Sequence, residues 1–145
     1  MPSSPNVPSA TLVPVTDEAR AALGNKDEIR MTRFPLKVGR ESRVGTFDKL
    51  KAEIERRFSG APQLNDVYLI ERPSFSLHIS REHFAIGYAD GRFVLLDRES
   101  ACGTIVAGIA IGSEHTERQI ELRDGDVITV GTADSPYKFR FKIGS

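Results

Sequence analysis

The chain has 145 residues with 20 Lys or Arg and 20 Asp or Glu, so its formal net charge at pH 7 is +0. This length suits one domain with a buried core. A neutral chain lacks the large cationic surface that bulk binding of nucleic acid or an anionic membrane requires, so neither is an expected partner. No segment approaches the roughly 20 apolar residues of a membrane span, and the N-terminus lacks a secretory signal pattern. We therefore expect a cytoplasmic protein.

The first 27 residues are expected to form a flexible tail or linker before a domain over residues 28–145. Residues 1–15 contain four prolines and no charged residue, a composition that buries little surface. Thr16–Leu23 is predicted to form one or two helical turns with Thr16 as the N-cap. Thr11 or Thr16, once phosphorylated, would be a ligand for a second copy of the chain, so self-association stays open.

From Ile29 onward, short apolar runs are separated by turns about every 8–12 residues, which predicts an antiparallel sandwich or barrel. Asp90-Gly91 is a two-residue hairpin signal, and Asp124-Gly125 is predicted to be a second turn of the same kind. The predicted strands lie at residues 29–33, 34–38, 67–70, 75–79, 83–88, 92–96, 105–106, 109–111, 119–122, 127–130 and 137–143.

One segment breaks the strand pattern. Phe47, Leu50, Ile54 and Phe58 recur at three- and four-residue steps, which predicts a short amphipathic helix over about 47–58. This helix is expected to be an insertion that packs its apolar face on the sandwich. The alternative is a contact with a partner helix or a second copy.

Two polar signatures stand out between the predicted strands: Ser80-Arg81-Glu82-His83, and the run Asp-Arg-Glu-Ser-Ala-Cys-Gly-Thr over residues 97–104. A Gly39-Arg40 pair lies upstream, and residues 122–131 read Leu-Arg-Asp-Gly-Asp-Val-Ile-Thr-Val-Gly. In this order, over about residues 29–143, the series resembles the forkhead-associated (FHA) domain, a β-sandwich that binds phosphothreonine peptides. The resemblance implies an all-β, FHA-like antiparallel sandwich.

The resemblance also implies a role for individual residues. Arg40 and Ser80 would hold the phosphate, since the planar guanidinium of an arginine can engage two phosphate oxygens at once. Three residues would line the rest of the phosphopeptide site: Arg81, Ala101 and Cys102. Four residues would support the site: Gly39, His83, Gly103 and Thr104. Among these, His83 would brace the loops by hydrogen bonding rather than act in catalysis.

The chain departs from the family pattern at Cys102 and Ala107, where the family has asparagine, and both positions are expected to touch the ligand. A thiol is a weak donor and a weak acceptor. Losing one hydrogen bond to the peptide costs on the order of 1 kcal/mol, or roughly five-fold in affinity. Ala101 likewise offers no hydroxyl where some family members have a second phosphate-contacting Ser or Thr.

The expected function is that of a phosphothreonine-peptide-binding adaptor in Ser/Thr-kinase-linked signalling. Its expected partner is a phosphothreonine-containing protein such as a Ser/Thr kinase or its substrate. The alternative is an FHA-like domain that binds its partner independently of phosphate, which the two departures keep open.

Catalysis and cofactor binding are not expected from this sequence. Ser80 lies near His83, but there is no Gly-x-Ser-x-Gly elbow and no orienting carboxylate placed by the sequence. A single cysteine excludes an intramolecular disulfide and a cysteine-based zinc site. His78 and His115 belong to no cluster with metal-ligand spacing. We therefore expect neither an enzyme nor a resident metal or cofactor.

Overall fold

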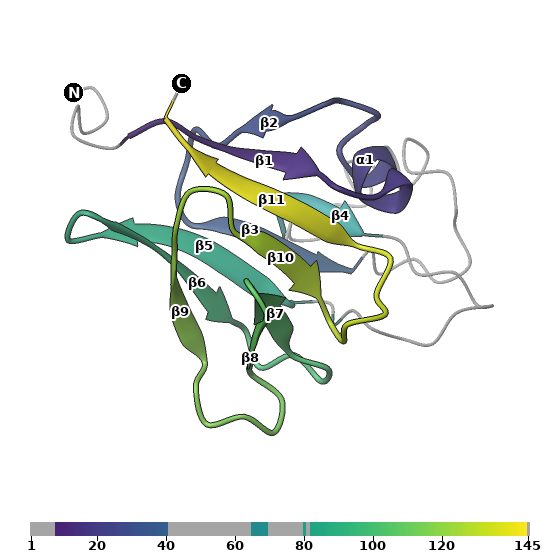
Figure 1. Ribbon diagram of the computed structural model, residues 1–145, viewed down its shortest axis with the longest axis vertical. Helices are drawn as coiled ribbons and strands as arrows, with labels where there is room; N and C mark the ends of the chain where they lie inside the picture. The colour runs from purple at the N-terminus through teal and green to yellow at the C-terminus, as the bar shows by residue number, and fades with distance from the viewer. Residues whose placement is uncertain (1–7, 41–64, 70–79, 81, 145) are drawn as a thin grey trace, which may run out of the picture.

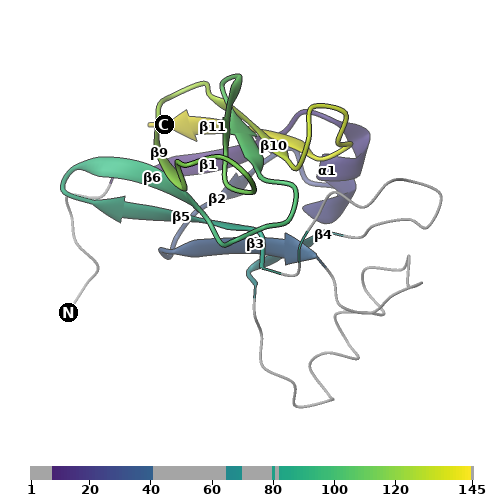
Figure 2. The ribbon, with the colours of Figure 1, turned by 90° about the horizontal axis from the view of Figure 1, so that it is seen from below.

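The computed structural model describes residues 8–40, 65–69, 80 and 82–144. Two β-sheets face each other across a shared core (Figures 1 and 2). The six-stranded sheet has the order β2 (Ile29–Arg30), β1 (Ala10–Pro14), β11 (Lys138–Ile143), β10 (Val127–Val130), β7 (Thr104–Val106) and β8 (Ile109–Ile111). The five-stranded sheet has the order β4 (Val67–Leu69), β3 (Leu36–Arg40), β5 (Phe84–Ala89), β6 (Arg92–Asp97) and β9 (Gln119–Leu122). The predicted all-β sandwich is confirmed.

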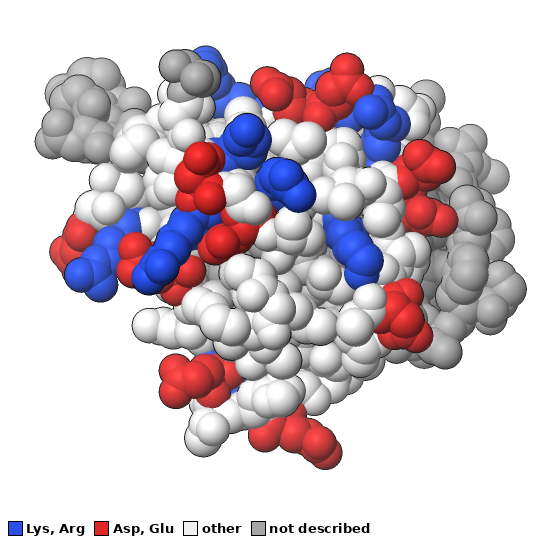
Figure 3. Space-filling model, in the orientation of Figure 1, with Lys and Arg blue, Asp and Glu red and all other residues white. Residues whose placement is uncertain are grey.

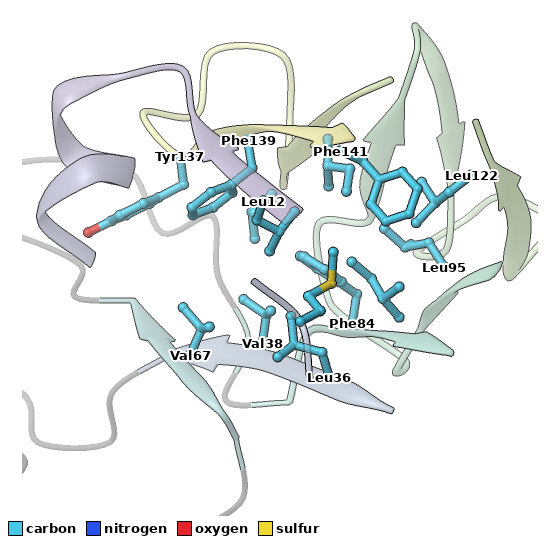
Figure 4. Close-up of a cluster of buried hydrophobic side chains, with 14 of the residues drawn as sticks. Leu12, Leu36, Val38, Val67, Phe84, Leu95, Leu122, Tyr137, Phe139 and Phe141 are labelled. Carbon is cyan, nitrogen blue, oxygen red and sulfur yellow. The ribbon is translucent and has the colours of Figure 1, made fainter. Parts of the chain in front are cut away.

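The core lies between the sheets because apolar residues alternate along the central strands. In β11, Phe139 and Phe141 point inward and are almost fully buried, while Lys138, Arg140 and Lys142, which alternate with them, are charged. Phe84 of β5 and Leu95 of β6 meet them from the opposite sheet (Figure 4). Burying each such side chain stabilises the fold by about 1.5–3 kcal/mol. This two-residue period fixes which side chains remain on the outer face of each sheet.

The prediction of a flexible tail over residues 1–27 is wrong for residues 10–27. β1 pairs with β11 along its whole length, from Ala10 opposite Ile143 to Pro14 opposite Phe139. Leu12 is only 1% exposed, and Gly144 N donates to Ser9 O at 2.7 Å. Pro14 is tolerated because β2 pairs only with Thr11 and Leu12, so that β1 is an edge of the sheet at Pro14. The prolines of this segment favoured the prediction of a tail, although Ala10–Pro14 forms a short strand in which Ala10 and Leu12 are buried.

The helix predicted after this strand is confirmed as α1 (Asp17–Ala22). Thr16 is its N-cap: Thr16 Oγ1 accepts from Ala19 N at 3.2 Å and donates to Pro136 O in the β10–β11 connection. Ala19 and Ala22 are buried against the sandwich. Thr11 lies within β1, opposite Lys142 and Arg30. Because both threonines belong to folded elements, the structure argues against either one serving as a tail ligand for a second copy.

Replacing Thr16 with alanine is expected to lower the free energy of unfolding by about 1–2 kcal/mol, since the change removes a helix cap and a second hydrogen bond. Urea denaturation would measure the effect. The exposed Thr116 provides the control, with Thr116→Ala expected to change stability by less than about 0.5 kcal/mol. Unchanged stability in Thr16→Ala would contradict the assignment of α1 to the folded domain.

The two predicted Asp-Gly turns differ in the structure. Asp90 and Gly91 both have positive φ (54° and 78°) and join β5 to β6 as the predicted hairpin. Asp124-Gly125 instead connects β9 of one sheet to β10 of the other. Gly125 N donates to Phe141 O, and Asp124 Oδ1 accepts from Ile143 N. The second turn is therefore a crossing between sheets and not a hairpin.

The predicted helix over 47–58 and the predicted strand over 75–79 lie outside the described residues. Among the residues that the structure does describe, no helix has the length and hydropathy needed to cross a membrane.

Candidate functional site

Two loops meet at one end of the sandwich. β3 and β5 run antiparallel with Val38 opposite Phe84, so the end of β3 and the start of β5 lie together. The loop of Ser80 and His83 precedes β5, and the 98–103 loop joins β6 to β7. Arg40 is the last residue of β3, with its backbone opposite Leu69. Arg40 therefore ends its strand beside these loops, while the Arg40 side chain and Arg81 lie outside what the structure describes.

Ser80 and His83 connect the two loops. Ala101 N donates to Ser80 Oγ at 2.9 Å. Ser80 N donates to His83 Nδ1 at 2.9 Å, and His83 Nε2 lies 2.7 Å from Gly103 O. Since Nδ1 accepts, the geometry assigns the neutral tautomer with its proton on Nε2, donating to Gly103 O. Ser80 Oγ accepts from Ala101 N through one lone pair, and its O–H can still donate to an acceptor that approaches the loops.

His83 is fully buried, and its surroundings favour the uncharged ring. Burial lowers the pKa of His83 below its usual value, against opposing contributions from the Gly103 carbonyl and from Asp97. The Ser80 N–H pointing at Nδ1 acts in the same direction as burial, because a proton on Nδ1 would face another donor. Both ring nitrogens are engaged with backbone groups, so neither is available to Ser80 Oγ. His83 is a bracing residue of the two loops.

A buried carboxylate organises the second loop. Asp97 is 3% exposed; its Oδ1 accepts from Ser100 N at 2.8 Å, and its Oδ2 accepts from Ser100 Oγ at 2.6 Å and Thr104 Oγ1 at 2.9 Å. Ser100 Oγ in turn accepts from Gly103 N at 3.0 Å. We call these four residues (Asp97, Ser100, Gly103 and Thr104) the Asp97 cluster. It holds the turn that presents Ala101 and Cys102.

Two glycines allow the chain to pack against this cluster. Gly112 has φ of +74°, and a Cβ at this position would lie 2.3 Å from the carboxyl carbon of Asp97. Gly103 has φ of +79°, and its Cβ would lie 2.7 Å from Ile111 O. Both positions combine a left-handed backbone with a close approach, so only glycine fits. The support role expected for Gly103 thus has a steric basis.

Arg98 connects the loops to the segment just before β4. Its guanidinium donates to Asn65 Oδ1 at 2.7 Å and to Glu82 Oε1 at 2.8 Å, and Arg98 N donates to His83 O at 2.8 Å. The Arg98 side chain is only 14% exposed. Asp97, Ser100 and Arg98 were not among the predicted site residues. The Asp-x-x-Ser spacing indicates the first two, because short polar side chains cap the backbone of their own turn.

The two departures from the family pattern lie in different places. Cys102 is half-buried in the same loop as Ala101, whose carbonyl accepts from Ser113 Oγ at 2.8 Å. Ala107 forms the β7–β8 turn, with φ of +51°. This turn lies at the opposite end of those short strands from Ala101, so the expectation that position 107 lies in the ligand site is not supported. Asparagine there would suit the left-handed turn.

The candidate site thus consists of backbone and hydroxyl groups on two loops that hydrogen bonds hold together. Within the described parts of the chain, no group of three His, Cys, Asp or Glu residues is placed to hold a metal ion. Binding loops on a stiff β-scaffold are typical of recognition modules, because little ordering is required when the ligand arrives.

The class that this fold defines is a β-sandwich protein-interaction module. The chain belongs to the FHA domain family: the model of the FHA domain matches residues 52–131. The comparison with curated proteins gives no match.

Solved structures of FHA domains share the fold. The FHA domain of an Arabidopsis thaliana hypothetical protein superposes with a TM-score of 0.63 at 22% identity, covering 100% of this chain and 93% of that one. The FHA domain of CT664 from Chlamydia trachomatis gives 0.57 at 20% identity, with coverages of 92% and 96%. EmbR from Mycobacterium tuberculosis, solved with a low-affinity phosphopeptide, gives 0.54 at 20% identity, with coverages of 95% and 25%.

Proposed function

We propose that this protein is a phosphothreonine-peptide-binding adaptor that joins partner proteins in response to a Ser/Thr kinase. The observation that carries the proposal is the Ser80–Ala101 hydrogen bond. It joins the two loops and leaves the Ser80 hydroxyl hydrogen to be donated to an incoming oxyanion. The EmbR domain, which was solved with a phosphopeptide, and a further FHA structure described for phosphothreonine-dependent interactions support the choice of ligand.

In the proposed complex, Arg40 supplies the cation and Ser80 a neutral donor to the phosphate. A hydrogen bond to a charged group contributes about 1.5–3 kcal/mol, more than a neutral pair. Ala101 and Cys102 lie on the turn held by the Asp97 cluster, where they would border the peptide, and Arg81 would face it from the first loop. The partner is then a phosphothreonine-containing protein, such as a kinase or its substrate, encountered in the cytoplasm.

The test is binding of a degenerate phosphothreonine peptide library to the full chain. We expect threonine-selective binding, weaker for phosphoserine and absent after phosphatase treatment. Arg40→Ala is expected to reduce affinity at least ten-fold. Arg33→Ala is the matched control, because Arg33 is exposed and lies before β3; this variant should bind like wild type. Binding that persists after phosphatase treatment, or in Arg40→Ala, would overturn the proposal in favour of phosphate-independent recognition.

A further inference from the structure

The outer face of the six-stranded sheet carries a line of basic side chains. In β11, Lys138, Arg140 and Lys142 alternate with buried phenylalanines, so all three project outward from the sandwich. Figure 3 shows basic side chains along the course that β11 takes in Figure 1. We call these three residues of β11 the cationic row. Arg30 of β2 is exposed and extends the row sideways, because Thr11 lies opposite both Arg30 and Lys142.

The charges of the cationic row and of Arg30 are not balanced by ion pairs within the described parts of the chain. The ion pairs found there join Arg20 to Asp27, Arg92 to Glu121 and Arg98 to Glu82. Lys138 Nζ donates to the carbonyl oxygen of Ala133 at 2.8 Å, a contact that leaves the charge of Lys138 unpaired. Like charges on one strand repel each other, so an anion that reaches all three is attracted by their combined field.

The surroundings of the cationic row restrict the shape of a ligand. Val13 of β1 and Val127 of β10 lie on either side of Arg140 in the register, and both are half-buried. Figure 3 shows acidic side chains on both sides of the basic ones. Asp124 and Asp126 lie in the turn before β10, where their carboxylates accept from backbone N–H groups. A broad anionic surface would also meet these acidic side chains, so the row is suited to a narrow anionic chain.

The spacing of the cationic row matches that of an extended peptide. Alternate residues of a strand lie on one side of it and about 7 Å apart, so carboxylates at every second position of an extended segment recur at the interval of the cations. We propose that the cationic row binds an extended acidic segment of a partner protein, with Asp or Glu at alternate positions. Each carboxylate faces one cation, and the methylene groups of the acidic side chains lie beside Val13 and Val127.

The cationic row is separate from the loops proposed to bind phosphothreonine. The loops lie at one end of the sandwich, whereas the row lies on the outer face of a sheet. Lys138 is the member of the row nearest the loop end, because Thr129 lies opposite both Lys138 and Ile105, just after the 98–103 loop and Thr104. The two sites can therefore be occupied at once. A partner that carries both a phosphothreonine and an acidic segment would gain the avidity of paired sites.

The experiment measures binding of fluorescein-labelled, unphosphorylated peptides to the full chain by fluorescence anisotropy, with protein titrated to millimolar concentration. The probe peptide has Glu at alternate positions with Ser between them, and its isomer has the same composition with the Glu residues consecutive. We expect the probe to bind about five-fold more tightly, because consecutive carboxylates of an extended chain point to opposite sides, and added salt should weaken binding. No binding of the probe, or equal binding of the isomer, overturns the proposal.

Variants locate the binding on this face. Arg140→Gln is expected to weaken binding of the probe about five-fold. Arg92→Gln is the matched control, since Arg92 is exposed on β6 of the other sheet and its replacement makes the same change in net charge. Both variants should keep the thermal unfolding of wild type, because both positions face solvent. Equal binding by Arg140→Gln and Arg92→Gln overturns the assignment to the cationic row.

A reversal of charge tests the sign of the partner. The double variant Arg140→Glu with Lys142→Glu should lose the probe and bind instead a peptide with Lys in place of each Glu. Tighter binding of a single-stranded oligonucleotide than of the probe by wild type overturns the choice of an acidic protein segment. Arg40→Ala should bind the probe like wild type. Failure of this inference and failure of the phosphothreonine proposal are therefore distinguishable.

Discussion

Replacing Asp97 with alanine is expected to lower the free energy of unfolding by about 3–5 kcal/mol, because a buried carboxylate that accepts from several donors is removed at once. The backbone N–H of Ser100 and the hydroxyls of Ser100 and Thr104 all lose their acceptor. Each buried donor left unsatisfied costs about 1–3 kcal/mol, although the hydroxyls recover part of this by rotating to other acceptors. Urea denaturation monitored by circular dichroism measures the change.

Asp126→Ala is the matched control for this variant. Asp126 also caps a turn, with Oδ2 accepting from Arg123 N at 2.8 Å, but it is partly exposed and water can replace it. We expect its loss to cost about 1 kcal/mol. If Asp97→Ala were no more destabilising than Asp126→Ala, the cluster would not be the element that holds the 98–103 loop.

Acidification between pH 6.5 and 5 is expected to destabilise the protein through His83. The pKa of His83 is lowered in the folded state by burial, whereas in the unfolded chain it is about 6.5. Below that value the unfolded state binds a proton that the folded state resists, so the free energy of unfolding falls as pH falls. The slope approaches about 1.4 kcal/mol per pH unit until the folded-state pKa of His83 is reached.

Protonation of His83 would disrupt its hydrogen bond with the backbone of Ser80. A proton on Nδ1 opposes the Ser80 N–H that now donates to it, so the link between Ser80 and His83 is lost first. Urea denaturation at a series of pH values would give the slope, and His83→Gln is expected to remove it because glutamine does not titrate. His115→Gln, at an exposed position, is the control and should retain the slope. An identical slope in wild type and His83→Gln would contradict the assignment.

The fold could be predicted from the sequence where local patterns and turn chemistry agree. Alternation along β5, β6 and β11 and the Asp90-Gly91 pair indicate strands and a hairpin without tertiary information. β1 could not be found in this way. Its run from Ala10 to Pro14 lies among prolines, and its place is decided by pairing with β11, more than 120 residues later in the chain. Asp124-Gly125 was misassigned for a related reason, since a turn signal does not state which sheet receives the next strand.

The candidate site could be predicted where motif residues contact one another across loops. His83 was expected to brace the loops, and the structure shows how, through Ser80 N and Gly103 O. Arg98 could not be foreseen, because its contacts with Asn65 and Glu82 depend on how the segment before β4 and the two loops meet in space. Ala107 illustrates the reverse case, since its motif position suggested a ligand contact while its backbone forms the β7–β8 turn, at the other end of these strands from Ala101.

The hydrogen bond from Gly144 to Ser9 has a consequence for how this domain can be combined with other sequences. Thr104, which begins β7 just after the 98–103 loop, pairs with Val130 at the end of β10, and the neighbouring Thr129 lies opposite Lys138, the first residue of β11. Gly144 instead follows the far end of β11. Residues 9 and 144 therefore leave the sandwich as neighbours, away from the loops. The domain could be grafted through these two positions into a surface loop of a carrier protein, and its loop end would still face outward.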